Sequence, residues 1–290
     1  MNDSLNRDYG GKAAAEIRER CTECLLCVEE CGFLKHQGTP KGIASSLFSD
    51  RGCPGDLPFE CSLCRLCDAV CPEGLSPADM FLTLRAECLR DNPSILSRYS
   101  RLLRYERLGS SKLLSLRAFP DDCDTVFFPG CNLPGSMPGA TERLVREMSL
   151  RIPRLGIVID CCNRPSHDLG REAFFRERFG TQMADLRNHG IAMLITACPN
   201  CHELFSRYAT GLHVISAFSL MAEWGITVGA RGDAALTIHD PCAFRFRGEV
   251  TAAARKLLSD SGISFREMTH NGRNTICCGE GGAVERVNRN

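Results

Sequence analysis

Short hydrophobic runs alternate with segments of helical periodicity in the second half of the chain. The apolar runs are 125–128, 155–159, 192–196 and 236–238. The helical segments between them are 140–150, 170–189 and 250–261. An apolar run of this length followed by an amphipathic stretch is typical of a buried parallel strand and its crossover helix. The pattern predicts an α/β region built from parallel βαβ units.

The first 92 residues lack this alternation. Turn-rich segments at 38–40 and 51–56 separate short stretches of helical periodicity, so we expect short helices joined by loops. From Pro93 onward, apolar residues at helical spacing, interrupted at 109–111, predict a helical connector. The sequence therefore predicts an α+β protein with a mainly helical domain at 1–92, a basic helical connector at 93–122 and an α/β domain at 123–290.

Composition limits the class of protein. The chain has 290 residues, of which 43% are hydrophobic, enough for the cores of two domains. Its N-terminus lacks the apolar segment of a signal peptide and no apolar run could cross a bilayer, so we expect a cytoplasmic protein. The nineteen cysteines are an odd number, which excludes a fully paired disulfide framework. In a reducing compartment, regularly spaced cysteines indicate metal or redox chemistry.

Two cysteine quartets share the spacing C-x2-C-x2-C-x3-C. They are Cys21, Cys24, Cys27 and Cys31, then Cys61, Cys64, Cys67 and Cys71. In two-cluster ferredoxins, which have this spacing, the fourth cysteine of each run ligates the cluster of the other run. We therefore predict two [4Fe-4S] clusters, held by Cys21, Cys24, Cys27 and Cys71 and by Cys61, Cys64, Cys67 and Cys31. The second quartet is followed by Pro72, as the motif prefers, whereas the first is followed by Gly32.

Zinc is the main alternative for these quartets, because paired CxxC motifs also form four-cysteine zinc sites. A zinc site has no use for the middle cysteine of each triplet, which favours clusters. Cys53, Cys88 and Cys123 fall outside both spacings, and we expect them to be buried or incidental thiols rather than ligands.

A second cysteine system follows the predicted strands of the α/β region. Its members are Cys131, Cys161, Cys162, Cys198 and Cys201. Because parallel strands present their carboxyl ends at one edge of a sheet, we expect these thiols to converge on one site. The alternative is a group of reduced thiols that fill the core at strand ends.

A partial copy of this system comes later in the chain. It has Cys242, Cys277 and Cys278, and the CxxC that would complete it falls beyond Asn290. Two interpretations stay open. Three thiolates either hold a cluster with an open iron or a non-cysteine ligand, or they are the remnant of a truncated or split sequence.

These motifs resemble those of heterodisulfide reductase-related iron-sulfur proteins, which join a two-cluster ferredoxin domain to a cysteine-rich domain of the CCG type. The iron-sulfur subunit of anaerobic glycerol-3-phosphate dehydrogenase and subunits for glycolate and lactate oxidation combine the same domains. Besides the quartets, the resemblance rests on Pro-Gly-Cys131, Asp-Cys-Cys162, His-Asp-Leu-Gly170, Ala-Cys-Pro-Asn-Cys201, His-Asp-Pro-Cys242 and Cys-Cys-Gly-Glu-Gly-Gly282. The chain departs from the family pattern at Asn163, where the motif has glycine.

The resemblance implies a third iron-sulfur centre, which in heterodisulfide reductase is a non-cubane [4Fe-4S] cluster that works at a disulfide substrate. Its ligands here would be the five cysteines from Cys131 to Cys201. The implied function is an iron-sulfur electron-transfer subunit of a multisubunit oxidoreductase, passing electrons through two cubanes to or from this cysteine-rich site and a disulfide or quinone-like acceptor. Whether the chain is itself an enzyme stays open beyond its being a component of an oxidoreductase.

Expected partners are a flavin dehydrogenase or a membrane cytochrome-type subunit, and such a partner would place the chain at the inner face of the membrane. No flavin or nicotinamide fingerprint occurs in the chain, so a hydride donor would belong to another subunit. The alternative is an electron-carrier or partner-binding module with no active site of its own.

Other residues give weaker signals. His167, His202 and His239 lie beside cysteines and could tune a cluster or pass protons, but such histidines are more often structural. The zero formal net charge gives no reason to expect nucleic-acid binding. Residues 94–118 carry six basic residues against Glu106 alone, which indicates a solvated helix face or a docking surface for an acidic partner or lipid.

Overall fold

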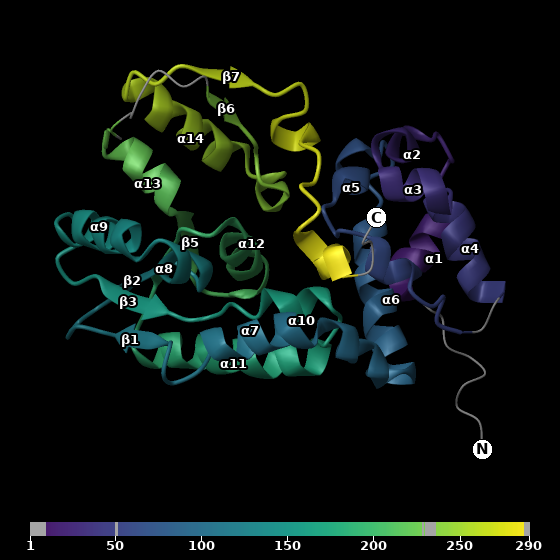
Figure 1. Cartoon of the computed structure of the whole chain (residues 1–290), viewed down its shortest axis with the longest axis horizontal. Helices are drawn as coiled ribbons and strands as arrows, with labels where there is room; N and C mark the ends of the chain where they lie inside the picture. Colours follow the sequence, from purple (N-terminus) through teal and green to yellow (C-terminus); the bar gives the residue numbers. More distant parts are fainter. Residues whose placement is uncertain (1–9, 50–51, 228, 230–235, 287–290) are drawn as a thin grey trace. The chain divides into compact units, whose positions relative to one another are not determined.

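The computed structural model describes residues 10–49, 52–227, 229 and 236–286 (Figure 1). The chain forms two compact units. The first contains the residues up to Leu102, the segment Pro165–Ala173 and the residues from Arg273 onward, and the second contains Leu103–Arg164 and Phe174–Gly272. Each unit is therefore assembled from segments that are far apart in the sequence.

The regular elements described in the first unit are all helices. The α-helices are α1 (Gly11–Arg20), α2 (Leu26–Glu30), α3 (Gly32–Gln37), α4 (Pro40–Ser49), α5 (Leu66–Val70), α6 (Pro77–Asp91) and α10 (Arg164–Asp168). The 3-10 helices are η1 (Leu57–Glu60), η2 (Pro93–Tyr99), η4 (Gly272–Asn274) and η5 (Gly281–Arg286). The longest, α6, begins after Ser76, whose hydroxyl accepts a hydrogen bond from the Asp79 amide.

The core of the first unit lies between α1, α4 and α6. Ile17 of α1, Leu47 of α4 and Met80 and Leu84 of α6 are buried in one apolar cluster. The α6 residues recur at a spacing of four, which keeps them on one face of the helix. Several quartet cysteines are part of the same cluster, so the packing of these helices also positions the candidate ligands.

The fully buried side chain of Arg85 joins the three segments of the first unit. Its guanidinium donates hydrogen bonds to the carbonyl oxygens of Pro58, Cys61, Asp168 and Gly282 at 2.8, 2.5, 2.6 and 2.9 Å. Burial lowers the pKa of Arg85, because a charged group loses its hydration in the protein interior. A buried cation is tolerated only when its donors are satisfied, and here backbone carbonyls satisfy them.

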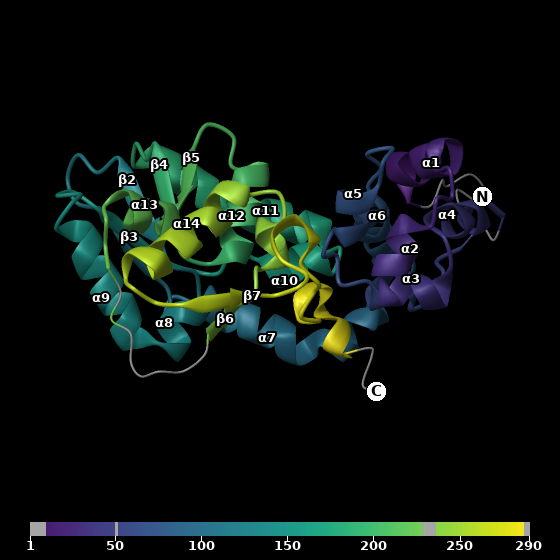
Figure 2. The ribbon, with the colours of Figure 1, turned by 90° about the horizontal axis from the view of Figure 1, so that it is seen from above.

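The second unit is built on a five-stranded sheet with the order β1-β3-β2-β4-β5 (Figure 2). Its strands are β1 (Leu116–Ala118), β2 (Thr125–Phe128), β3 (Gly156–Ile159), β4 (Met193–Thr196) and β5 (His213–Ser216). Strands β2 to β5 are parallel, and β1 pairs antiparallel with β3. The chain moves from β2 to β3 on one side and then returns to β4 on the other. The carboxyl ends of β2 and β4 therefore form a topological switch point, where open α/β sheets bind ligands.

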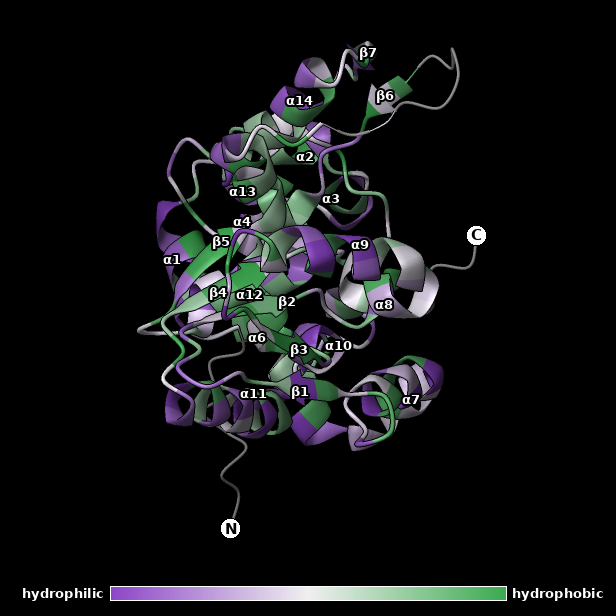
Figure 3. Ribbon diagram, turned by 90° about the vertical axis from the view of Figure 1, so that its left-hand side faces the viewer, coloured by the Kyte–Doolittle hydropathy of each residue, from purple (hydrophilic) through white to green (hydrophobic). Residues whose placement is uncertain are grey.

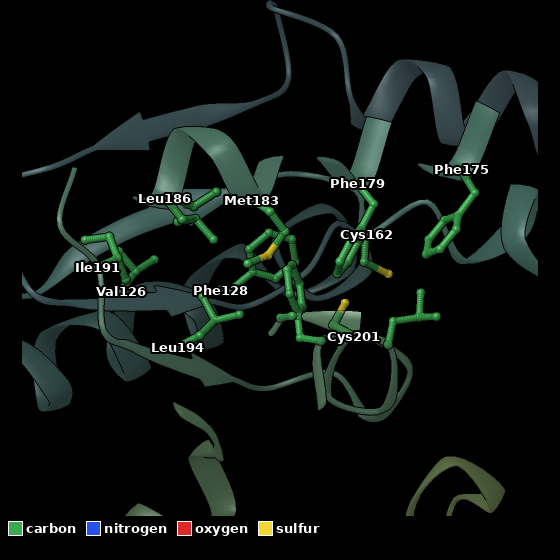
Figure 4. Close-up of a cluster of buried hydrophobic side chains, with 14 of the residues drawn as sticks. Val126, Phe128, Cys162, Phe175, Phe179, Met183, Leu186, Ile191, Leu194 and Cys201 are labelled. Atoms are coloured by element: carbon green, nitrogen blue, oxygen red, sulfur yellow. The ribbon is translucent and has the colours of Figure 1, made fainter. Parts of the chain in front are cut away.

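Helices pack on both faces of this sheet. On one face lie α11 (Glu172–Asn188) and α12 (Pro199–Tyr208), and on the other lie α9 (Pro138–Ser149) and α13 (Ala217–Glu223). The second unit also contains α8 (Asn132–Ser136), α14 (Gly248–Asp260) and most of α7 (Ser100–Gly109). Phe128 and Phe179 of α11 belong to one buried cluster (Figure 4), which also contains Phe205 of α12. The neighbouring Phe127 points to the opposite face of the sheet and packs with Met148 of α9. Because both faces are covered, the central strands are hydrophobic along their length (Figure 3).

A smaller parallel sheet of two strands completes the second unit. Strands β6 (Leu236–Ile238) and β7 (Phe265–Glu267) are joined through the 3-10 turn η3 (Cys242–Phe244) and α14. Arg255 of α14 forms ion pairs with Asp240 at 2.8 Å and with Glu267 at 2.6 Å. These two pairs tie the helix to the ends of both strands.

The α+β class and the mainly helical N-terminal part are confirmed, and strands lie in all four predicted apolar runs. The three predicted helical segments become α9, α11 and α14. Strands β1, β5 and β7 were not predicted, because three or four residues of mixed polarity carry little periodic signal. The domain boundaries at residues 92 and 122 stay predictions.

The expectation of free thiols at Cys53 and Cys88 is wrong. These two residues form a disulfide that joins the loop before η1 to α6. Sequence spacing cannot reveal such a pair, because 35 residues separate its members. Cys123 is a buried free thiol, as expected. In the part of the chain that the structure describes, no helix is both long and apolar enough to span a bilayer.

We expect Gly170→Ala to destabilise the first unit. Gly170 has φ +80°, and a Cβ there would lie 2.4 Å from the backbone nitrogen of Ala86. The left-handed conformation alone costs alanine about 1–2 kcal/mol, and the backbone contact adds to this cost. Thermal unfolding of anaerobically purified protein should show a lower midpoint.

Gly180→Ala is the matched control. Gly180 lies inside α11, and a Cβ there would meet nothing within 4 Å. Alanine is favoured over glycine in a helix by about 1 kcal/mol, so this variant should unfold at an unchanged or higher temperature. Equal midpoints for the two variants would contradict the close approach at Gly170.

Candidate metal centres

The first group of converging cysteines contains Cys21, Cys24, Cys27 and Cys71. They line one pocket of about 460 Å³, a volume that includes the part open to solvent. Cys21 and Cys24 lie in the loop between α1 and α2, Cys27 lies in the first turn of α2, and Cys71 follows α5. Helices α2 and α5 pack against each other, which brings the end of the second quartet to the first.

The thiols of this pocket are close enough to influence one another. The pKa of Cys27 is raised to about 11, first by burial and then by the neighbouring Cys21, Cys24 and Cys71. Burial and like charges both disfavour ionisation, so the Cys27 thiol stays protonated unless a cation is present. A metal centre reverses this preference, because thiolates are its ligands.

The second group contains Cys61, Cys67 and Cys31, with Cys64 in the same loop. Burial, followed by neighbouring charges that include Cys31, raises the pKa of Cys61 to about 12 and raises that of Cys67 as well. The pKa of Cys64 is also raised, principally by a hydrogen bond with the Cys277 thiol. Cys31 therefore lies with the second quartet, as Cys71 lies with the first.

The two cysteine loops share an uncommon backbone conformation. Glu23, Leu25, Leu63 and Arg65 all have positive φ, at 54°, 66°, 52° and 61°, and they occupy equivalent positions between the cysteines. Non-glycine residues avoid this region, so its repetition indicates backbone held in place for a purpose. In the second loop it directs the Leu63 amide to the Cys61 sulfur at 3.4 Å. Amide hydrogen bonds to sulfur are one means by which proteins set cluster potentials.

The residues present fit two cubane clusters on the chemistry of their donors. Each group offers four sulfur atoms from two loops, and the first surrounds a pocket of substantial volume. Among the residues that the structure describes, no three His, Cys, Asp or Glu side chains are arranged to hold a single metal ion.

The five-cysteine set converges at the carboxyl ends of the central strands of the second unit. Cys131 follows β2, Cys161 and Cys162 follow β3, and Cys198 and Cys201 follow β4. Hydrogen bonds connect Cys131 with Cys161, Cys162 with Cys201, and Cys201 with Cys198. The sulfur atoms of Cys162 and Cys201 face each other in Figure 4. The whole set thus lies at the topological switch point of the sheet.

The pKa is lowered for two thiols of the five-cysteine set and raised for two others. The pKa of Cys198 is lowered to about 6, first by a hydrogen bond from Cys201 and also by backbone amides at the start of α12. The pKa of Cys131 is likewise lowered by a hydrogen bond from Cys161, whereas the pKa values of Cys161 and Cys201 are raised. A thiolate at a helix N-terminus, hydrogen-bonded by its neighbours, is suited to bind a metal.

Two glycines let the backbone approach the five-cysteine set. A Cβ on Gly109 would lie 3.3 Å from Cβ of Cys131, and one on Gly130, which has φ +83°, would lie 3.1 Å from the Cys201 sulfur. One turn before Gly109 in α7, the Tyr105 hydroxyl forms a hydrogen bond with Cys131. Helix α7 therefore presents one face, at positions i and i+4, to the cysteines.

Buried polar atoms without partners surround the same place. Among the described residues, the atoms Oγ of Ser110, Oδ1 of Asn163 and Oε1 of Gln182 are buried with no hydrogen bond. The amide nitrogens of Asn163 and Gln182 both donate to the Cys161 carbonyl, at 3.1 and 3.0 Å. Unsatisfied buried polar atoms are costly and concentrate at functional sites. The five-cysteine set is thus a polar, thiol-rich cradle that fits an iron-sulfur centre.

The backbone explains why asparagine can stand where the family motif has glycine. Asn163 has φ +61°, and Gly279, at the equivalent position after Cys277 and Cys278, has φ +86°. Glycine enters this left-handed region at no steric cost, and asparagine is among the residues that tolerate it best. The departure from the motif therefore preserves the backbone path after the cysteine pair.

The three cysteines of the partial set are divided between the two units. Cys277 and Cys278 belong to the first unit, where Cys277 contacts Cys64, whereas Cys242 belongs to the second. The role predicted for the three as cluster ligands stays a prediction. The basic segment also has internal partners, since Arg98 pairs with Asp56, and Arg117 pairs with Asp160.

The histidines beside the cysteines have structural partners. His202 contacts the Thr196 hydroxyl at 2.9 Å, and burial lowers its pKa to about 4, so it is neutral at physiological pH. His167 contacts Asp168 at 2.8 Å in the first unit. The pKa of Asp240 is lowered mainly by its hydrogen bond with Arg255, and the neighbouring His239 contributes less.

Family models match the two cysteine systems separately. Residues 17–75 match a 4Fe-4S dicluster domain, and residues 125–206 and 236–289 match a cysteine-rich domain. The two matches together are the signature of heterodisulfide reductase-like iron-sulfur proteins. The chain accordingly has [4Fe-4S] clusters in its N-terminal domain and a role in electron transfer. No curated protein and no solved structure matched the chain.

Sequence reasoning missed several residues at the five-cysteine site. Tyr105, Gly109 and Gln182 lie outside the cysteine motifs, and their roles depend on the packing of α7 and α11 near the strand ends. The closest signal was the glycine at 109, which was interpreted as a helix break. The break is confirmed, because α7 ends at Gly109, and this end of the helix lies beside Cys131.

We expect Asn163→Gly to preserve the fold and the iron content, because glycine adopts the same left-handed backbone. Asn163→Val should destabilise the second unit by about 2 kcal/mol, since a β-branched residue strongly disfavours positive φ. The two variants remove the same hydrogen bonds, so the comparison isolates the backbone effect. Unfolding midpoints and iron per chain that are equal in both variants would show that the backbone conformation does not matter here.

Proposed function

We propose that this chain is the iron-sulfur subunit of a multisubunit oxidoreductase, in which electrons pass through two cubanes to or from the five-cysteine site. The proposal is supported chiefly by one observation, the convergence of Cys131, Cys161, Cys162, Cys198 and Cys201 at the switch point of the second unit. A module that only bound a partner would have no need of five adjoining thiols around unsatisfied polar atoms.

Different cysteines of the chain would hold the three clusters. Cys21, Cys24, Cys27 and Cys71 would hold the first cubane, and Cys31, Cys61, Cys64 and Cys67 the second. The five-cysteine set would hold a further [4Fe-4S] centre. When bound, these clusters supply one-electron redox chemistry. The Leu63 amide donates to the Cys61 sulfur, and the Tyr105 hydroxyl holds a proton at Cys131 beside the third centre.

The acceptor side of the reaction belongs to the five-cysteine site. Tyr105 is about half exposed, whereas Cys161 and Cys162 beside it are buried. Its phenol could therefore exchange a proton between solvent and the thiol cluster, as reduction of a disulfide or a quinone-like acceptor requires. The hydride-transferring step, for which the chain has no fingerprint, would occur on a partner flavin dehydrogenase, or electrons would pass to a membrane cytochrome-type subunit.

Iron and sulfide analysis of anaerobically purified protein tests this function. We expect about twelve irons per chain, eight for the cubanes and four for the additional centre. About eight would favour an electron carrier without an active site, and stoichiometric zinc would contradict the proposal. Elemental analysis decides between these outcomes directly.

Cys162→Ser should remove only the additional centre, with a loss of about four irons per chain and of its EPR signal. Cys123→Ser is the matched control, because Cys123 is an equally buried thiol of the second unit outside the five-cysteine set. The control should keep its full iron content. If Cys162→Ser also keeps it, the five-cysteine set does not hold a cluster.

A further inference from the structure

The C-terminal segment of the first unit lies along the loop of the second quartet. Arg273 donates from its guanidinium to the Ala69 carbonyl oxygen at 3.2 and 3.3 Å. At the other end of the segment, a Cβ on Gly281 would lie 2.8 Å from the Ser62 carbonyl oxygen. The segment 273–282 is therefore held at both ends against residues 61–69.

Arg85 holds the C-terminal segment against the loop of the second quartet. Its guanidinium donates both to the Cys61 carbonyl and to the Gly282 carbonyl. Gly282 has φ +64°, and a Cβ there would lie 2.8 Å from the Cys61 carbonyl oxygen. The closeness of the two backbones thus depends on glycine at this position and on the shared buried cation.

Between these anchors, Cys277 faces the second quartet. Its thiol is hydrogen-bonded to that of Cys64, and the Gly279 amide donates to the Cys277 sulfur at 3.3 Å. An amide donor stabilises a thiolate, as the Leu63 amide does for Cys61. The next residue, Cys278, is exposed. Cys277 therefore resembles a ligand in its backbone setting and lies next to a predicted ligand.

The first quartet has no such neighbour. Cys24 is the counterpart of Cys64 in the first loop, and it is exposed. The described lining of its pocket comes from residues 17–77, and its one cysteine besides Cys21, Cys24, Cys27 and Cys71 is Cys67, which is a predicted ligand of the second cubane. The two predicted cubane sites therefore differ in one respect, since the second has a fifth thiol beside its middle cysteine.

We propose that Cys277 is an alternative ligand for the iron that Cys64 holds in the second cubane. In the exchange, the iron–sulfur bond to Cys64 breaks as a bond to Cys277 forms. The proton of the Cys277 thiol passes to the Cys64 sulfur, and no electron is transferred. This proposal rests on the assignment of the second cubane to Cys31, Cys61, Cys64 and Cys67. It also assigns Cys277 to the ferredoxin part rather than to a set with Cys242.

The test compares equivalent substitutions in the two quartets. Cys24→Ala should convert the first cluster to a three-iron form, because the described lining of its pocket contains no cysteine other than the predicted cubane ligands. Cys64→Ala should leave the second cluster in its four-iron form, held by Cys277, and the double variant Cys64→Ala/Cys277→Ala should lose that iron. EPR of the oxidised proteins distinguishes the forms, because a [3Fe-4S] cluster is paramagnetic when oxidised and a [4Fe-4S]²⁺ cluster is not.

A three-iron signal in Cys64→Ala equal to that of Cys24→Ala would overturn the proposal. The proposed function fails separately, since it requires the unsubstituted protein to contain both cubanes. If the cubanes of that protein contained about four irons instead of eight, the proposed function would be contradicted without any comparison of variants.

A second measurement keeps the proposal testable if Cys64→Ala does not fold. Mild oxidation with ferricyanide removes one iron from a cubane, so Cys277→Ala should accumulate the three-iron form of the second cluster several-fold faster than the unsubstituted protein. Cys278→Ala is the matched control, because Cys278 is the adjacent exposed cysteine. Equal rates in Cys277→Ala and Cys278→Ala would overturn the role of Cys277.

Discussion

An iron-sulfur cluster needs thiolates from several directions, and a single short loop cannot surround it. This constraint accounts for much of the first unit. Each C-x2-C-x2-C loop supplies three sulfurs, and α2 and α5 pack together so that Cys71 reaches the first loop and Cys31 the second. The two predicted sites thereby depend on each other, because the first needs Cys71, which follows α5, and the second needs Cys31, which follows α2.

The second unit meets the same requirement with a sheet. Parallel strands bring Cys131, Cys161 and Cys198 to one edge of the sheet although they are distant in sequence. Backbone must approach closely there, which explains Gly109, Gly130 and the left-handed Asn163. The buried oxygen atoms left without partners around these residues are a cost that an apolar core would avoid, and they are consistent with a site for a polar group.

The buried Arg85 relates the cysteine loops to the rest of the chain. Hydrogen bonds from a charged donor contribute about 1.5–3 kcal/mol each, and the carbonyls that accept them come from three separate segments. Burying the guanidinium is costly, so the cost is recovered only when all three segments are in place. This dependence explains why residues 165–173 and 273–282 belong to the helical unit, and it positions Cys277 beside Cys64.

The sequence by itself determined the α+β class, the central strands and both cysteine systems, because motif spacing and hydrophobic periodicity are local properties. It did not reveal the Cys53–Cys88 disulfide, the hydrogen bond of Tyr105 to Cys131, or the position of Cys277. In the linear pattern Cys277 and Cys278 resembled half of a second cysteine-rich set. Only the tertiary structure placed them with the first unit, because the buried hydrogen bonds of Arg85 join residues almost 200 positions apart, with a separation of 197 between Arg85 and Gly282. No local pattern records a contact of that range.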